Sequence, residues 1–219
     1  ITVVTENWYP FNYLDKNGNI VGKSTDIVKK VLSDASVDYS IDIYPWERSI
    51  NLARTRPNVL IYSILRTPIR EKLFHWICPI SNKVKHQVYK LASRKDVVVK
   101  SEEDIKNYSL SLTRGTFPHQ YMQSLGLVDG VNLQVTSEND KNAKMLLKGR
   151  VDLIVEVESA IYSILIAQGL KPDYITPLIT ISSKNNPDNC MAISKQTPIA
   201  LVERIRQSHD NVINKLEHH

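Results

Sequence analysis

The sequence predicts an α/β fold, in which strands and helices alternate along the chain. Short apolar runs with the length of buried strands alternate with segments whose apolar residues recur at helical spacing. Ser, Thr, Pro and Gly residues stand at the ends of many of these segments, where they favour the start or the end of a helix. This order is typical of α/β sheets covered by helices.

The first half of the chain begins with a buried strand over residues 1–5 and a loop that ends in the turn Asn17-Gly18. A helix follows, for which Ser24 or Thr25 supplies the cap. The later elements of this half are a half-buried strand over 39–43, a helix that Pro45 opens, and an apolar strand over 59–63.

The second half repeats this order. The turn Arg114-Gly115-Thr116 separates a strand with Leu110 and Leu112 from a short helix. The other elements expected here are a helix capped by Ser101, a strand over 131–135, a helix from Ser137 to Gly149, a strand over 151–157, a helix from Ser159 to Gly169, and a last helix opened by Thr197 and Pro198. Ligands of open α/β sheets bind at the carboxyl ends of strands. We therefore expect one cleft at the turns that follow Thr5, Ser63, Leu112 and Val157.

Composition and charge exclude several classes of protein. Hydrophobic residues make up 42% of the 219 residues, which suffices for real cores and excludes a disordered or fibrous chain. Charged residues interrupt every apolar run before it reaches the length of a membrane span. The net charge of +5 is dispersed, without a basic stripe interleaved with aromatic residues. We therefore expect no membrane span and no nucleic-acid partner.

Catalytic, cofactor and metal motifs are absent from the sequence. It lacks the Gly-x-Ser-x-Gly elbow, the phosphate-binding loop and the dinucleotide fingerprint. Four histidines have no metal-binding spacing and are expected to be surface or packing residues, namely His75, His86, His119 and His209. The two cysteines, Cys78 and Cys190, allow one disulfide, but we expect two buried free thiols. The sequence thus predicts neither a cofactor nor a metal site.

The two ends of the chain carry further signs. The chain begins at Ile1 without an initiator Met, directly on the first strand, as expected of a mature protein after removal of a signal peptide or of a shortened chain. Residues 216–219, Leu-Glu-His-His, resemble the start of a histidine tag. We therefore set these four residues aside in the functional argument.

Four groups of residues, taken in order, carry a resemblance to a known family. They are Trp8-Tyr9-Pro10-Phe11 with Gly18, Gly22 and Asp26-Ile27; Arg66-Thr67-Pro68-Ile69-Arg70-Glu71-Lys72; Gly149-Arg150-Val151-Asp152; and Met191-Ala192-Ile193-Ser194-Lys195. In this order nearly the whole chain resembles the periplasmic amino-acid-binding components of ABC transporters. These proteins form family 3 of the bacterial extracellular solute-binding proteins and share the type II periplasmic binding fold.

The resemblance implies two α/β lobes with a ligand cleft between them. Residues 1–88 and 191–215 are expected to form lobe 1, and residues 89–190 are expected to form lobe 2. Two crossover strands, near 88–93 and 189–194, are expected to join the lobes and to let them close about a ligand.

The resemblance also implies roles for residues of lobe 1. Arg70 stands at the position of an arginine that clamps a ligand carboxylate, a role that suits its planar charged fork; the alternative is a surface arginine that pairs with Glu71 or a helix end. Trp8 matches an aromatic residue that packs on the solute, or else it is a core residue beside Phe11. Trp46, in a Pro-Trp-x-Arg segment, either lies near the cleft mouth or packs at the start of a helix.

Several positions depart from the pattern of amino-acid binders. Leu65 replaces a small hydroxyl residue, for which Ser63 can substitute as a ligand contact. In lobe 2 a Gly-Ser/Thr-Thr turn reads Gly115-Thr116-Phe117, so one of its two hydroxyls is missing, although the helix start can still bind an anion. We expect Thr116 and Phe117 to contact the ligand.

The acidic residue that would hold an α-amino group falls at Val157, between Glu156 and Glu158. On a strand these two glutamates share a face, opposite Val157, unless the strand has already turned there. Arg114 adds a second cation, which together with Arg70 could clamp a dicarboxylate or another anion, whereas Glu156 or Glu158 could receive an amine. The residues leave both alternatives open.

These residues and the resemblance predict a protein that binds a ligand and catalyses nothing. We expect a periplasmic monomer that captures a small polar, carboxylate-bearing solute, an amino acid or a related compound, and delivers it to an ABC transporter permease. One alternative is the ligand-binding domain of a membrane sensor, whose partner is a signalling module. Another is a dehydratase-like enzyme of the same fold, with Glu156 or Glu158 as general acid or base.

Overall fold

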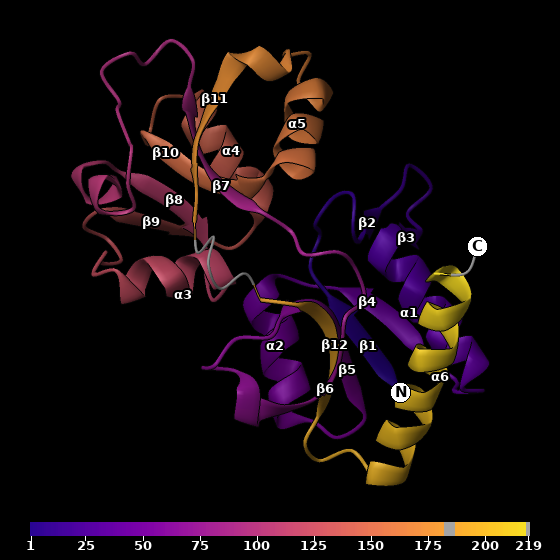
Figure 1. Ribbon diagram of the computed structural model, residues 1–219. Coiled ribbons are helices and arrows are strands. Elements are labelled where there is room, and N and C mark those ends of the chain that lie inside the picture. Colours follow the sequence, from indigo (N-terminus) through magenta and orange to yellow (C-terminus); the bar gives the residue numbers. More distant parts are fainter. Residues whose placement is uncertain (182–186, 218–219) are drawn as a thin grey trace. The chain divides into compact units, whose positions relative to one another are not determined.

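In the computed structural model, which describes residues 1–181 and 187–217, the chain forms two compact units. The first unit comprises Ile1–Lys83 and Pro187–His219, and the second comprises Val84–Asn186. Each unit contains a five-stranded sheet (Figure 1). The expected lobe boundaries, after residues 88 and 190, lie a few residues further along the chain than these limits. His218 and His219, in the segment that resembles a tag, lie outside the described residues.

The first unit is built on a mixed sheet with the strand order β4-β1-β5-β12-β6. Its strands are β1 (Thr2–Thr5), β4 (Ser40–Ile43), β5 (Val59–Leu65), β6 (Phe74–Ile77) and β12 (Asn189–Ser194), and a hairpin of β2 (Tyr13–Leu14) and β3 (Ile20–Val21) follows β1. β1 pairs in parallel with β4 and β5, whereas β12 pairs antiparallel with β5 and β6. The segment 189–194, which we expected to cross between lobes, is thus an inner strand of the first sheet.

Helices cover both faces of this sheet. They are α1 (Lys23–Asp34), α2 (Trp46–Thr55) and α6 (Ile199–Glu217), with the short 3₁₀ helix η1 (Glu71–Leu73) before β6. Leu60 faces the core shared with α1 and α6, and the next residue, Ile61, faces the core shared with α2. This alternation follows from the period of two along a strand. Val28, Val31 and Leu32 form the buried face of α1, as their helical spacing predicts.

α1 begins without a side-chain cap. Gly22 precedes the helix with a φ of 125°, and a Cβ at this position would collide with the backbone carbonyl of Phe11. That carbonyl accepts the N–H groups of Ser24 (2.9 Å) and Thr25 (3.3 Å). The prediction that Ser24 or Thr25 caps the helix was wrong, because a loop carbonyl rather than a hydroxyl satisfies the first donors.

Cys78 and Cys190 form a disulfide with an S–S distance of 2.08 Å. The pairing of β6 with β12 places Ile77 opposite Met191, which brings Cys78 and Cys190 to a Cα–Cα distance of 4.5 Å. That distance lies in the range of disulfides. The prediction of two free thiols was wrong, because the two cysteines are 112 residues apart in sequence and only the register of the sheet brings them together.

The second unit is built on a mixed sheet with the strand order β11-β7-β10-β8-β9. Its strands are β7 (His86–Leu91), β8 (Leu110–Thr113), β9 (Leu133–Thr136), β10 (Leu153–Val157) and β11 (Ile175–Thr180). β8 pairs in parallel with β9 and β10, whereas β7 pairs antiparallel with β10 and β11. β7, which covers much of the other expected crossover segment, is therefore an inner strand of this sheet.

Helices also cover both faces of the second sheet. They are α3 (Phe117–Ser124), α4 (Asn139–Leu147) and α5 (Glu158–Ala167), with the 3₁₀ helices η2 (Glu103–Asn107) and η3 (Pro172–Tyr174). Val155 of β10 packs in the core that contains Met122 of α3. The preceding Ile154 packs in the core that contains Leu146 of α4 and Leu165 of α5. Each unit therefore has two cores, one on each face of its sheet.

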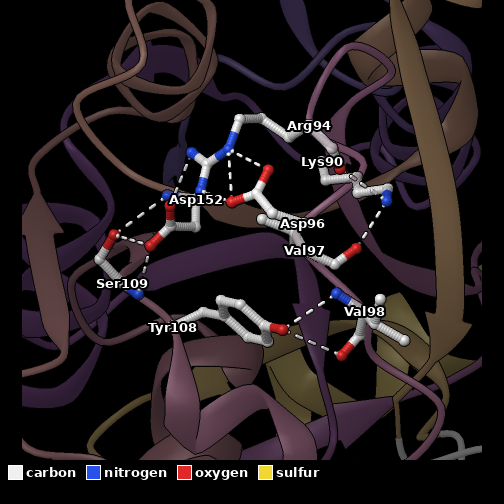
Figure 2. Close-up of polar contacts among 8 residues, drawn as sticks. All are labelled: Lys90, Arg94, Asp96, Val97, Val98, Tyr108, Ser109 and Asp152. Atoms are coloured by element: carbon white, nitrogen blue, oxygen red, sulfur yellow. Dashed lines mark hydrogen bonds and ion pairs between the residues drawn. The ribbon is translucent and has the colours of Figure 1, made fainter.

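Figure 2 shows the polar contacts of Asp152, the last residue of the Gly-Arg-x-Asp segment. Asp152 Oδ2 accepts the backbone N–H (3.0 Å) and the hydroxyl (2.7 Å) of Ser109, and Oδ1 lies 2.8 Å from Arg94 Nη1. Burial alone would raise the pKa of Asp152, but the hydrogen bonds from Ser109 and Arg94 bring this pKa below its usual value. Because Ser109 precedes β8 and Asp152 precedes β10, the carboxylate joins the amino ends of two parallel strands.

The same view shows how the segment after β7 is held (Figure 2). Lys90 Nζ donates to the carbonyls of Arg94 (2.9 Å) and Val97 (2.6 Å). The hydroxyl of Tyr108 accepts the N–H of Val98 at 3.0 Å. These contacts support the amino ends of the strands, whereas the candidate site concerns their carboxyl ends.

Candidate functional site

Arg70 lies at the carboxyl edge of the first sheet, where the parallel strands β1 and β5 end. Its side chain is folded back onto the end of β5, where Nη1 donates to the carbonyl of Leu65 at 3.0 Å. Its Cζ lies 5.4 Å from the ring centroid of Trp46, the first residue of α2. Only 1% of Arg70 is exposed. Arg70 is therefore a buried cation at the carboxyl edge of the first sheet.

The surroundings of Arg70 decide its charge. Burial lowers the pKa of Arg70 to about 10, and the negative charge of Glu6 opposes that shift. The guanidinium therefore remains protonated at neutral pH. Glu71, the expected surface partner, pairs instead with Arg66 through two hydrogen bonds of 2.8 and 2.5 Å. Of the two alternatives for Arg70, the structure thus excludes a surface ion pair with Glu71.

The two tryptophans expected to contact a ligand are both buried in the first unit. Trp8 is 6% exposed, and its ring centroid lies 4.3 Å from that of Phe11. Trp46 is 3% exposed and packs in the core under α2 with Arg70 beside its ring. These contacts are those of the packing alternatives, and a contact with a solute stays a prediction for both residues.

Ser63 occupies an irregular position in β5. The register between β5 and β12 shifts between Cys190 and Met191, and Ser63 there has a φ of 57°. Such bulges re-aim side chains next to functional sites. The hydroxyl of Ser63 donates to Asn12 Oδ1 at 2.5 Å, and Asn12 Nδ2 donates to the carbonyl of Glu6 at 2.6 Å. Ser63 therefore supports the backbone beside Glu6, and its own contact with a ligand stays a prediction.

In the second unit, the turn after β8 holds Arg114 and Thr116 in different ways. Arg114 is exposed, and its Nη1 lies 3.5 Å from Asp129 Oδ2. The hydroxyl of Thr116 donates to the carbonyl of Thr113 at 2.8 Å and does not cap α3. A hydrogen bond between Thr116 and Thr113 thus stabilises the turn. Arg114 is the exposed cation of this turn.

Phe117 and His86 form an aromatic contact at the carboxyl edge of the second sheet. Phe117 is the first residue of α3 and His86 is the first residue of β7, and their ring centroids are 5.6 Å apart. Burial lowers the pKa of His86 to about 4, so its imidazole is neutral at pH 7. His86 is thus a packing residue, one of the two roles expected for it.

Glu156 and Glu158 do not share a strand face. β10 ends at Val157 and Glu158 is already the first residue of α5, so the strand has turned before Glu158, the exception left open from the sequence. Glu156 is 8% exposed, and its Oε1 accepts the N–H of Val157 at 2.7 Å. Glu156 pairs in the sheet with Gln87 of the neighbouring strand β7. Gln87 Oε1 accepts a hydrogen bond from the hydroxyl of Tyr89 at 2.8 Å. Glu156 is therefore part of a polar group on one face of the sheet.

Two tyrosines close to these glutamates, Tyr89 and Tyr162, have raised pKa values. Burial raises the pKa of Tyr89, and the negative charges of nearby groups, Glu158 and Glu156 among them, add to the shift. Burial and the contact with Glu158 likewise raise the pKa of Tyr162. The two glutamates are thus close enough to act on the same phenols, although they lie on different elements.

Sequence reasoning missed three polar residues at these edges. Glu6 directly follows β1, so the rule that ligands gather at carboxyl ends of strands could have found it. Asn12 and His119 are buried, at 0% and 5% exposure, and each hydrogen-bonds to a backbone group, that of Glu6 and that of Gly115. Residue type alone does not distinguish these two side chains from ordinary packing residues.

Two kinds of feature are missing from the described part of the chain. Within residues 1–181 and 187–217, no helix combines the length and the apolar character that crossing a membrane requires. Over these same ranges, His, Cys, Asp and Glu side chains form no group of three or more that could hold a metal ion.

Solved structures of similar fold come from binding proteins and from a sensor. An ancestral arginine-binding protein bound to arginine has a TM-score of 0.82 at 18% identity, over 97% of this chain and 92% of that one. The arginine-, lysine-, histidine-binding protein ArtJ from Geobacillus stearothermophilus has a TM-score of 0.80 at 18% identity, over 98% and 90%. A histidine kinase sensor domain with similarity to periplasmic binding proteins has a TM-score of 0.84 at 15% identity, over 99% and 91%. These likenesses confirm the predicted type II periplasmic binding fold.

The family follows from the sequence match. A search of curated proteins found no match. The family model of the bacterial extracellular solute-binding proteins, family 3, matches residues 1–216 and thus nearly the whole chain. The chain belongs to family 3 of the bacterial extracellular solute-binding proteins.

Proposed function

We propose that this protein binds a small carboxylate-bearing solute, an amino acid or a related compound, and that its two units close on the solute. Membership of a solute-binding family supports this, as do structural neighbours that bind arginine. The observation that carries the proposal is Arg70, a protonated arginine at the carboxyl edge of the first sheet. Ligands of α/β sheets bind at that edge.

Arg70 suits a carboxylate because its guanidinium offers parallel N–H donors in a fixed plane. Leu65 O and the ring of Trp46 hold this plane in place, and the charge of Glu6 offsets that of Arg70 within the unit. A solute carboxylate competes with Glu6 for the guanidinium. Because only 1% of Arg70 is exposed, the side chains that cover it must move when the solute binds.

We further propose that the second unit contributes Arg114, Thr116 and Phe117 from the turn after β8, and Glu156 or Glu158 from the end of β10. A basic solute such as L-arginine would use one of these glutamates, whereas a dicarboxylate would use Arg114. L-Arginine is the first solute to test, because several structural neighbours bind it. We assign binding rather than catalysis to the glutamates, which membership of a solute-binding family supports.

The test compares two arginines of the same segment. Arg70→Gln should weaken the binding of L-arginine by at least about thirtyfold, the lower range for a buried charged contact. Arg66→Gln removes an arginine whose side chain is 43% exposed and should leave the affinity unchanged. Titration calorimetry measures both, and Arg70→Lys, which keeps the charge but loses the fork, should bind with intermediate affinity.

Thermal unfolding of the unliganded variants separates binding from folding, because a ligand raises the melting temperature only through its affinity. Equal affinities of Arg70→Gln and wild type, with both folded, would contradict the role of Arg70. Wild-type protein that binds none of the amino acids or dicarboxylates would contradict the proposed function itself.

The macromolecular partner depends on whether the bound solute is transported or sensed. We propose a periplasmic monomer that delivers its solute to an ABC transporter permease. The likeness to a histidine kinase sensor domain favours a second candidate, the sensory domain of a membrane receptor. Deleting the gene in its host distinguishes them: loss of uptake of the labelled solute indicates transport, whereas normal uptake with a lost transcriptional response indicates a sensor.

A further inference from the structure

His119 connects the turn after β8 to an acidic residue in the following loop. The backbone N–H of Gly115 donates to His119 Nδ1 at 3.1 Å, and His119 Nε2 lies 2.9 Å from Asp129 Oδ1. The side chain of His119 is 6% exposed, and that of Asp129 is 33% exposed. A buried imidazole thus bridges a backbone donor and a carboxylate.

The two contacts define the tautomer of His119. Nδ1 accepts the N–H of Gly115, so the proton of the neutral ring is on Nε2, which donates to Asp129. Thr116 is the N-cap of α3, so His119 occupies the third helical position. In a capping box, a Glu or Gln side chain at this position reaches back to a backbone N–H before the helix. His119 makes the same kind of contact one residue further back, with Asp129 on the other side of its ring.

Asp129 holds both sides of the turn. Its Oδ1 accepts from His119 and from Gln123 Nε2 (3.2 Å), and its Oδ2 lies 3.5 Å from Arg114 Nη1. Burial alone would raise the pKa of Asp129, but these hydrogen bonds and charges lower it, so the carboxylate is ionised at neutral pH. Gly115 itself has a φ of 70°, which favours glycine.

We infer that His119, oriented by Asp129, is a positioning residue that sets the conformation of the Arg114-Gly115-Thr116 turn for ligand binding. The inference rests on the proposed function, in which this turn supplies Arg114 and Thr116 to the solute. Because the N–H of Gly115 points to His119, the groups that the turn offers to the proposed solute are the Arg114 side chain and the start of α3. Loss of the imidazole therefore changes how the turn is presented without removing any residue that touches the solute.

The test uses two substitutions at this position. His119→Leu keeps an apolar volume but removes the acceptor, whereas His119→Gln keeps an oxygen acceptor and an N–H donor. In ¹H–¹⁵N spectra, the Gly115 amide signal should move and exchange faster with solvent in His119→Leu, and should return toward its wild-type position in His119→Gln. The affinity for L-arginine should fall about tenfold in His119→Leu, the factor that one lost hydrogen bond accounts for, and should recover in His119→Gln.

The outcomes separate this inference from the proposed function. An unmoved Gly115 signal in His119→Leu would overturn the inference, as would an unchanged affinity in that variant. A lowered affinity with no recovery in His119→Gln would also overturn it, because a purely apolar packing defect would then explain the loss. Wild-type protein that shows the Gly115 contact but binds no amino acid or dicarboxylate would contradict the proposed function instead.

Discussion

At the scale of single residues, the molecule buries charged and titratable groups at the carboxyl edges of both sheets. Arg70 and Glu6 lie in the first unit, and His86, His119 and Glu156 lie in the second. Burial of a charged side chain costs free energy unless a partner compensates it, so most charged side chains lie at the surface. Burial lowers the pKa of Arg70 and of His86, and groups with perturbed pKa values gather at functional sites, which is why these edges carry our proposals.

His86 makes the stability of the protein depend on pH. Its pKa is about 4 in the folded protein, below the ordinary histidine value of 6.5 that applies to the unfolded chain, so between these values the unfolded chain binds more protons. The contribution of neutral His86 is therefore complete above about pH 6.5 and is lost as the pH falls toward 4. We expect the free energy of unfolding to drop by roughly 2–3 kcal/mol over this window on account of His86.

Urea unfolding at several pH values checks this, with His86→Gln as the control variant. Carboxylates that titrate in the same window act equally on both proteins, so the difference between the two curves isolates His86. The difference should change steadily from pH 6.5 to pH 4. Parallel curves across the window would show that His86 keeps an ordinary pKa.

At the scale of elements, the segments that enter and leave the first unit are joined side by side. Besides the disulfide, the N–H of Ile80 donates to the carbonyl of Asn189 at 2.8 Å, and Asn189 Nδ2 donates to Ser81 Oγ at 3.0 Å. Lys83 Nζ lies 3.5 Å from Asp188 Oδ1. The outgoing chain after β6 and the returning chain before β12 thus behave as one paired element.

Reduction of the disulfide should loosen this paired element. Removal of a disulfide typically costs about 2–5 kcal/mol of stability, and the cost is larger for long loops such as this one of 112 residues. We expect dithiothreitol to lower the urea midpoint of the wild type and to speed hydrogen exchange of the Ile80 amide. The double variant Cys78→Ala/Cys190→Ala should show both changes without dithiothreitol and no further response to it. A wild type that is indifferent to dithiothreitol, with free thiols detected, would show that the disulfide contributes nothing.

The order of strands and helices is largely predictable from the sequence, because it depends on local periodicity. The strand over 59–63 and the helix that Pro45 opens are close to β5 and α2. The errors concern contacts between segments: the cap of α1 is a carbonyl of the loop after β1, and the disulfide follows from sheet register. A pattern of residue types does not report such contacts.

At the scale of the whole molecule, the chain consists of two units, each with cores on both faces of its own sheet. The proposed closure on a solute would leave both cores of each unit intact. Part of the candidate site is predictable in the same way: resemblance and strand order could locate Arg70, Glu6 and the turn after β8, whereas the contacts of Asn12 and His119 emerge only from the folded units.

The most direct test of the central claim, that the protein binds a solute through its carboxylate, is calorimetric titration with matched pairs of compounds. Each pair joins an amino acid to the amine left when its carboxylate is removed: L-arginine with agmatine, L-lysine with cadaverine, and L-histidine with histamine. We predict that at least one amino acid binds and that its amine binds at least about thirtyfold more weakly, because it offers Arg70 no anion. Equal binding of an amino acid and its amine, or binding of the amines alone, would contradict this account.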